Sequence, residues 1–233
     1  MIDTTSPDFW PDLFDVLLLG TGQTLYMVFF ALVFTVLIGL PVGILLVGTE
    51  RGGLFEKPFG SRTFGRILNR VLDFVVNLGR SVPFIILMIA IIPFTRLVVG
   101  TTLGPTAAVV PLSVGAIPFF ARLVETSLRE IQRGKVEAAV VQGASYGQII
   151  RKVLIPESLP GVVSGLTNSV IALISYSAMA GTIGGGGLGF LAKSRGYDRF
   201  QGDIMLVTVI VIVIIVQIVQ VVGDRVSRSL DHR

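Results

Sequence analysis

Long blocks of apolar residues alternate with shorter polar segments along this chain of 233 residues. An apolar block of about 20 residues is long enough to cross the hydrocarbon core of a membrane as a helix. The last block has nineteen uncharged residues, which form roughly 28 Å of helix at 1.5 Å per residue. The pattern therefore predicts an all-α integral membrane protein with five transmembrane helices, at about residues 22–47, 71–94, 105–124, 161–180 and 204–222.

The same pattern divides the chain into three parts. Residues 1–21 form an external or interfacial N-terminal segment, and residues 22–225 form the transmembrane domain with a polar central loop at 134–156. Residues 226–233 form a short tail. No basic n-region or small-residue cleavage site of a signal peptide is recognisable near the start.

Composition supports a membrane protein and excludes several kinds of site. The chain is 52% hydrophobic and 15% charged, whereas soluble domains carry about 25% charged residues. There is no cysteine, and the one histidine is His232 in the tail, so the sequence offers neither a disulfide framework nor a Cys or His metal cluster. No paired carboxylates or Ser-His-Asp set share a common depth, and we expect no catalytic residues and no metal site.

The basic residues predict the orientation, because cytoplasmic loops are enriched in Lys and Arg. With five spans, the first loop, the central loop region and the C-terminal tail share one side. They carry Arg51, Lys57, Arg62, Arg66, Arg70, Arg122, Arg129, Arg133, Lys135, Arg151, Lys152, Arg225, Arg228 and Arg233, against Arg96, Lys193, Arg195 and Arg199 on the other side. We therefore expect the N-terminus outside and the C-terminus inside. The net charge of +4 is explained by topology, so no nucleic-acid partner is expected.

The central loop has a specific spacing of residues. Glu137, Ala138 and Ala139 are followed after three residues by Gly143, and after nine more by Val-Leu-Ile and Pro156. This order predicts a short helix at about 134–142, a left-handed or closely packed position at Gly143, and a second amphipathic turn that ends where Pro156 starts a new helix. An ordinary amphipathic loop helix with an alanine pair is the alternative interpretation.

This spacing resembles the EAA loop of bacterial ABC importer permeases, in which a cytoplasmic coupling helix docks on an ATPase subunit. The runs 80–101, 149–161 and 175–189 are also similar to the permease subunits of methionine ABC importers, of the binding-protein-dependent transport system inner membrane component family. The resemblance implies a type I importer fold in the cytoplasmic membrane. It also implies ATPase coupling through Glu137, Ala138, Ala139, Gly143 and Pro156.

The resemblance implies partners and a substrate as well. The chain would work as a homodimer with two cytoplasmic ABC ATPase subunits and an external methionine-binding lipoprotein, and would carry D- or L-methionine. ATP and Mg²⁺ would bind the ATPase, and this chain would hold no cofactor. A permease for another small amino acid, a secondary transporter and a channel or scaffold are the alternatives. A secondary transporter would need midplane carboxylates and usually internal repeats.

The fourth predicted span has the most polar groups at membrane depth, and these must face protein or water. Asn168, Ser175, Tyr176, Ser177 and Met179 are candidates for a translocation pathway, or for polar contacts between packed helices. The glycine run at 181–189 lacks the Lys-Ser/Thr pair of a phosphate loop and predicts a connector at the mouth of a cavity. Glu125 and Arg80 lie near the predicted cytoplasmic ends of spans, where snorkelling of the charged group to water explains them. We expect a structural role for Glu125, and the role of Arg80 stays open.

Overall fold

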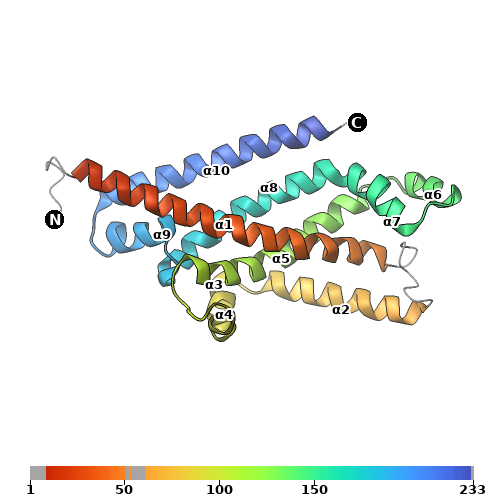
Figure 1. Ribbon diagram of the computed structural model, residues 1–233, viewed down its shortest axis with the longest axis horizontal. Helices are drawn as coiled ribbons and strands as arrows, with labels where there is room; N and C mark the ends of the chain where they lie inside the picture. The colour runs from red at the N-terminus through yellow and green to blue at the C-terminus, as the bar shows by residue number, and fades with distance from the viewer. Residues whose placement is uncertain (1–8, 51–52, 54–60, 232–233) are drawn as a thin grey trace. The chain divides into compact units, whose positions relative to one another are not determined.

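The computed structural model describes residues 9–50, 53 and 61–231. Every secondary-structure element assigned within these ranges is helical (Figure 1). The longer helices are α1 (Phe9–Gly48), α2 (Arg62–Ser81), α5 (Pro105–Arg129), α8 (Ile155–Ala180) and α10 (Gly202–Leu230). Short elements connect them: α3 (Phe84–Ala90), α4 (Ile92–Val99), α6 (Arg133–Val141), α7 (Tyr146–Ile149), α9 (Gly187–Leu191) and the π-helical turns η2 (Ile150–Leu154), η3 (Gly181–Gly185) and η4 (Ala192–Tyr197).

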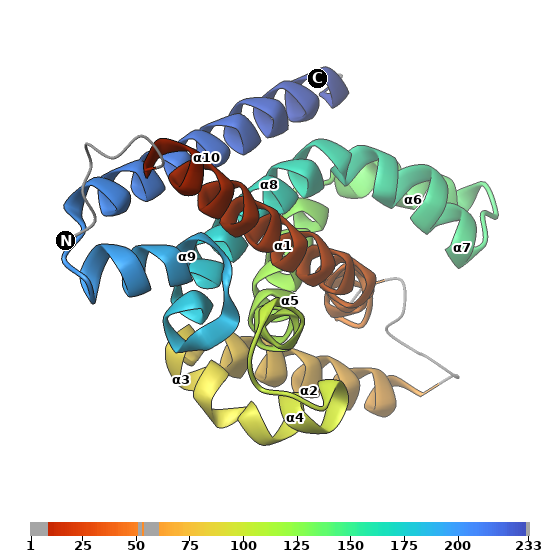
Figure 2. The same cartoon turned by 60° about the vertical axis from the view of Figure 1, so that its left-hand side comes forward.

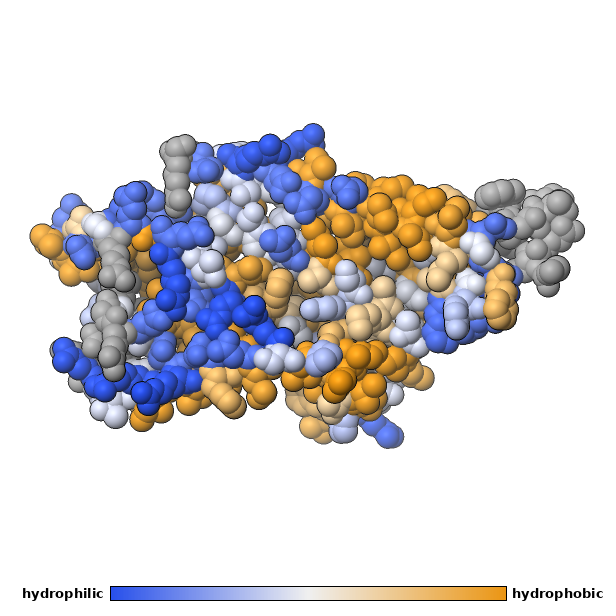
Figure 3. Space-filling view, turned by 180° about the vertical axis from the view of Figure 1, so that it is seen from behind, coloured by the Kyte–Doolittle hydropathy of each residue, from blue (hydrophilic) through white to orange (hydrophobic). Residues whose placement is uncertain are grey.

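Four helical stretches of the described residues are long and apolar enough to cross a membrane. They are Leu13–Gly48, Pro105–Arg129, Tyr146–Gly185 and Gly202–Leu230, and α2 with α3 makes a fifth if that broken pair counts as one span. Figure 3 shows the protein from behind, with a broad orange surface of hydrophobic residues beside clusters of blue hydrophilic ones. Residues 1–8 and 232–233 of the predicted terminal segments, and the basic residues Arg51 and Lys57, lie outside the described part.

The predicted span at 71–94 is not one continuous helix. Helix α2 ends at Ser81, Pro83 adopts an extended ψ of 133°, and α3 starts at Phe84. Proline has no N–H to continue the helical ladder, and it disfavours helical angles in the residue before it. The apolar composition of 71–94 hid this break, because hydropathy alone does not register the backbone requirement of one proline.

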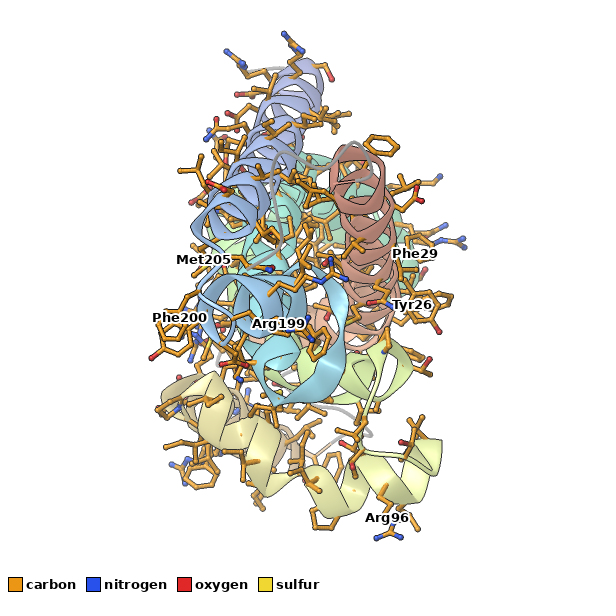
Figure 4. All side chains as sticks on the ribbon, turned by 90° about the vertical axis from the view of Figure 1, so that its left-hand side faces the viewer. Tyr26, Phe29, Arg96, Arg199, Phe200 and Met205 are labelled. Carbon is orange, nitrogen blue, oxygen red and sulfur yellow. The ribbon has the colours of Figure 1, made fainter. Side chains whose placement is uncertain are left out.

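The chain divides into two compact units, each built from three segments. Unit 1 comprises Met1–Val33, Val82–Ala116 and Val170–Gln220, and unit 2 comprises Phe34–Ser81, Ile117–Ser169 and Val221–Arg233. In unit 1, Met27, Leu112 and Leu173 are fully buried in one apolar cluster. The rings of Phe84 and Tyr176 stack at 4.5 Å beside it. Figure 4 shows Arg96 of α4, also in unit 1, pointing away from the ribbon.

The glycine run in unit 1 is folded into helical turns that are anchored to α1. The Gly187 amide donates to Gln23 Oε1 at 2.7 Å, and the Leu188 amide donates to Thr24 Oγ1 at 2.9 Å. A Cβ at Gly189 would lie 2.2 Å from the carbonyl oxygen of Ala178, so the backbones of α9 and α8 touch there. Close backbone contact, in addition to connection, therefore accounts for glycine in this run.

Unit 2 is packed around the second half of α5. Figure 1 shows α2 beside the second half of α1 and beside α5, and these helices share a core of Leu46, Val76 and Ala121. Glycines let three neighbouring helices approach α5 closely. A Cβ at Gly43 of α1 would lie 2.7 Å from the Ala121 carbonyl oxygen, and one at Gly79 of α2 would lie 2.5 Å from Pro118. Gly161 and Gly165 of α8 meet Ser127 and Leu123 of α5 in the same way.

We expect Gly43→Ala to destabilise the protein by about 1–3 kcal/mol, the usual cost of overpacking a core. The added methyl group would meet α5 at 2.7 Å, on its backbone and on Val124. Gly22→Ala is the matched control, because it lies in the same helix and its Cβ would meet nothing within 4 Å. Thermal unfolding in detergent tests the pair, and equal midpoints for both variants would contradict the close packing.

Candidate coupling loop and transport pathway

The central loop folds into two short helices joined at a glycine, as its spacing predicts. Helix α6 ends at Val141, Gly143 has a φ of 77°, and α7 starts at Tyr146. Ser145 caps α7: its hydroxyl accepts from the Gln148 amide at 3.4 Å, and its own amide donates to Gln148 Oε1 at 2.8 Å. Figure 2 shows α6 and α7 close together around this turn. A left-handed φ suits glycine, because other L-residues are strained there.

The predicted coupling residues divide between an outer and an inner face. Glu137 and Ala138 are exposed, whereas Ala139 packs against a core of unit 2 that contains Ile149 and Leu154. The outer surface continues into Val140 and Val141, which are 52% and 87% exposed. This loop therefore presents a small, partly apolar surface next to one carboxylate, which suits contact with another protein.

The new helix start predicted at Pro156 is not found, because Tyr146–Gly185 forms one continuous helical stretch. The π-helical turn η2 leads directly into α8, which starts at Ile155. Pro156 follows the π-helical turn at the second position of α8, where the interrupted i→i−4 ladder accommodates a residue without an N–H. Lys135 of α6 pairs with Glu157 of α8 at 2.6 Å, so the coupling helix is tied to the span that follows it.

The five predicted pathway residues do not share one surface. Asn168 and Ser175 are exposed on α8 and lie seven residues apart, with exposed Ser164 four residues before Asn168, so these three share a face. Ser177 is buried, and its hydroxyl donates to the Ile174 carbonyl at 2.7 Å. Tyr176 and Met179 pack against the core of unit 1. A polar exposed face therefore remains for Asn168 and Ser175, and packing explains the other three.

A network of charged side chains in unit 2 was not foreseen from the sequence. The Glu125 side chain is 3% exposed. Its Oε2 accepts from Arg122 Nη1 at 2.7 Å, and its Oε1 accepts from Arg129 Nη2 at 2.7 Å and Nε at 3.1 Å. Two ion-paired arginines, and not snorkelling to water, satisfy this carboxylate. The structural role expected for Glu125 fits this geometry.

The two arginines extend the network to neighbouring segments. Arg122 Nη2 donates to Asp73 Oδ1 at 2.9 Å and to Asn77 Oδ1 at 2.5 Å, both on α2. Arg129 Nη2 donates to Glu50 Oε1 at 2.5 Å, just after α1. The spacing Arg122, Glu125, Arg129 places the three on one helical face and is the sequence signal for the network. Its partners on α2 are 45 and 49 residues away, beyond any local pattern.

No group of three or more His, Cys, Asp or Glu side chains among the described residues could hold a metal ion. A pocket in unit 1 is lined by aliphatic side chains, small residues and the two threonines Thr95 and Thr102, without a charged group. Such a lining suits an apolar group and provides no general acid or base.

Residues 53–233 match the family described as binding-protein-dependent transport system inner membrane component. The chain belongs to this family. It is therefore an inner-membrane permease component of a transport system, and its helices cross the cytoplasmic membrane. The earlier resemblance to this family is confirmed.

The similar proteins include several methionine permeases. The chain is 52% identical over 219 residues to the probable D-methionine transport system permease protein MetI of Vibrio cholerae, covering 94% of each. It is 46% identical over 180 residues to the methionine import system permease protein MetP of Bacillus subtilis, covering 77% of this chain and 81% of that one.

Solved structures show the same fold. One described as inward-facing conformations of the MetNI methionine ABC transporter superimposes with a TM-score of 0.88 at 42% identity, covering 98% of this chain and 100% of that chain. An amino acid ABC transporter with histidines has a TM-score of 0.74 at 20% identity, a likeness that shows the fold alone. The predicted type I ABC importer permease fold is confirmed.

We expect Glu125→Gln to destabilise the permease by about 1–3 kcal/mol, because the buried side chain loses its charge and an amide oxygen can replace only one of the two carboxylate oxygens that accept from Arg122 and Arg129. The control is Glu157→Gln, which breaks the Lys135 pair, whose side chains are 45% and 34% exposed; pairs of that kind contribute about 1 kcal/mol or less. Thermal unfolding of the purified protein measures both. A Glu125→Gln midpoint no lower than that of the control would contradict the network's contribution.

Proposed function

We propose that this permease is the membrane subunit of an ATP-driven importer that carries methionine into the cell. The observation that carries the proposal is the 52% identity over nearly the whole chain to a probable D-methionine permease, supported by the MetNI likeness at 42% identity. The substrate is the part most open to test, since a permease for another small amino acid would have a similar loop and topology.

The proposed orientation places the N-terminus outside and the C-terminus in the cytoplasm. The excess of basic residues in the first loop, the central loop region and the tail supports it. With this orientation, α6, Gly143 and α7 face the cytoplasm, where ATP is available.

The proposed partners are a second copy of the chain, two ABC ATPase subunits and an external methionine-binding lipoprotein. The ATPase would dock on the outer surface of α6 and α7, where Glu137, Ala138, Val140 and Val141 are exposed. ATP and Mg²⁺ would bind the ATPase, so this chain needs no cofactor and performs no hydrolysis. The Lys135–Glu157 pair would carry a displacement of α6 to α8, and Asn168 and Ser175 would line the route of the solute.

Uptake of labelled methionine into proteoliposomes tests the function. The vesicles contain the permease, its ATPase and its binding protein, with ATP on the ATPase side. We expect ATP-dependent uptake that other amino acids inhibit poorly. ATPase stimulation without methionine uptake would keep the permease role and reject the substrate, and neither signal in an assembled complex would favour a channel or scaffold.

We expect Gly143→Val to uncouple transport, with ATP-dependent uptake reduced at least tenfold. No neighbouring atom lies within 4 Å of a Cβ at Gly143, so crowding is not the reason. The reason is the φ of 77°, which costs a non-glycine residue about 1–2 kcal/mol and is least accessible to a β-branched one.

Gly143→Asn is the matched control, because asparagine tolerates left-handed angles. Its uptake should stay within about threefold of the unaltered protein. Similar losses of uptake in the valine and asparagine variants would indicate side-chain interference at the docked surface instead of backbone strain. Full ATP-coupled uptake in the valine variant would contradict the prediction.

A further inference from the structure

Helix α2, which makes a broken candidate span together with α3, exposes two different faces. Val71, Phe74, Val75 and Leu78 are each more than half exposed and are spaced as one apolar face, which suits lipid. Asp73, Asn77 and Arg80, spaced by four and three residues, form a separate polar face. Polar groups at membrane depth must meet protein or water, so this second face borders a protein partner or an aqueous route.

The first two members of the polar face are already engaged. Asp73 and Asn77 both accept from Arg122, and Asn77 Nδ2 donates to Asp73 Oδ2 at 3.1 Å. Arg80 follows one turn later and is exposed, and its side chain makes no hydrogen bond or ion pair with any residue in the described part of the chain. The Asp73 carboxylate on the same face is already paired with Arg122. The positive charge of Arg80 therefore has no counter-ion among the described residues.

The depth of Arg80 argues against simple snorkelling. It lies ten residues beyond Arg70 in α2, roughly 15 Å along the helix at 1.5 Å per residue. With Arg70 at the membrane surface and α2 along the membrane normal, that distance would be about half of the ~30 Å hydrocarbon core. Ionisable residues at such depth are costly and mark solute paths by default. The break at Pro83 directly after it also interrupts the span there, as in other membrane binding sites.

We propose that Arg80 binds the carboxylate of the amino acid as it passes through the permease. This inference rests on the proposed function and names the residue that recognises the common part of the substrate. An arginine provides a planar pair of N–H donors that matches a carboxylate in two parallel hydrogen bonds. The side chain of the solute is left for other, apolar contacts, so Arg80 selects for an amino acid and not for methionine in particular.

The first experiment separates uptake from ATP hydrolysis in the reconstituted complex. Arg80→Gln should lower the maximal rate of methionine uptake at least tenfold. The ATPase activity stimulated by the loaded binding protein should stay above half of that of the unaltered complex, and the KM of the ATPase for ATP should be unchanged. Arg80→Lys keeps the cation and should retain at least a third of uptake. Arg96→Gln, at an exposed arginine of α4 (Figure 4), should transport normally.

The second experiment uses the absence of cysteine from the chain. Arg80→Cys introduces a single permease thiol, with the partners' thiols blocked before reconstitution. A methanethiosulfonate reagent forms a mixed disulfide with it and releases methanesulfinate. The aminoethyl reagent restores a positive charge and should recover at least a third of uptake, whereas the sulfonatoethyl reagent adds a negative charge and should recover none.

The outcomes distinguish the inference from the function on which it rests. Methionine uptake that is equal in the unaltered and Arg80→Gln complexes overturns the role of Arg80 and leaves the proposed function standing. Equal effects of the two reagents, or a thiol that neither reagent reaches, also overturn it, because the residue then faces lipid or another protein. Absent uptake in the unaltered complex overturns the function and this inference together.

Discussion

The burial of one carboxylate on α5 is the constraint on which unit 2 depends. Glu125 is 3% exposed, and an ion of that kind is tolerated in a protein interior only when it is paired and hydrogen-bonded. Arg122 and Arg129 meet this requirement, and each also donates to a second carboxylate, Asp73 on α2 and Glu50 just after α1. Glycines of α1 and α8 pack against other faces of the same half-helix, and Gly79 of α2 packs on Pro118, one turn before Arg122. These contacts connect the second half of α5 to α1, α2 and α8, so that a shift of α5 also displaces these neighbours.

The second half of α5 is followed directly by the proposed docking surface. Only residues 130–132 separate the end of α5 from the start of α6, so α6 has little freedom relative to α5. The Lys135–Glu157 pair and the core shared by Ala139, Ile149 and Leu154 tie α6 to α8 as well. A force applied to the exposed surface of α6 would therefore reach two spans at once, whereas the left-handed turn at Gly143 keeps α7 folded back beside it.

The sequence was sufficient where a property is local and failed where it depends on distant residues. The apolar blocks identified the spans because hydropathy reports contact with lipid directly, and the spacing from Glu137 to Pro156 identified two short helices and their glycine joint. The break at Pro83 was missed because a long apolar run outweighed one proline. The Arg122 contacts to α2 were missed because no spacing rule connects residues so far apart. Likewise, only packing distinguishes exposed Asn168 from buried Ser177 on one helix.

The two faces of α2 also bear on how a route for the solute could be enclosed. Apolar side chains at Phe74 and Leu78 can meet lipid without cost, but Asp73, Asn77 and Arg80 cannot. Asn77 and Arg80 of this face are exposed in a single chain, and so is the face of α8 that carries Ser164, Asn168 and Ser175. Exposed polar side chains on two helices need water or protein as hydrogen-bond partners. Water inside a membrane must in turn be enclosed by protein. One copy leaves these faces open, which supports the proposed pairing with a second copy of the chain.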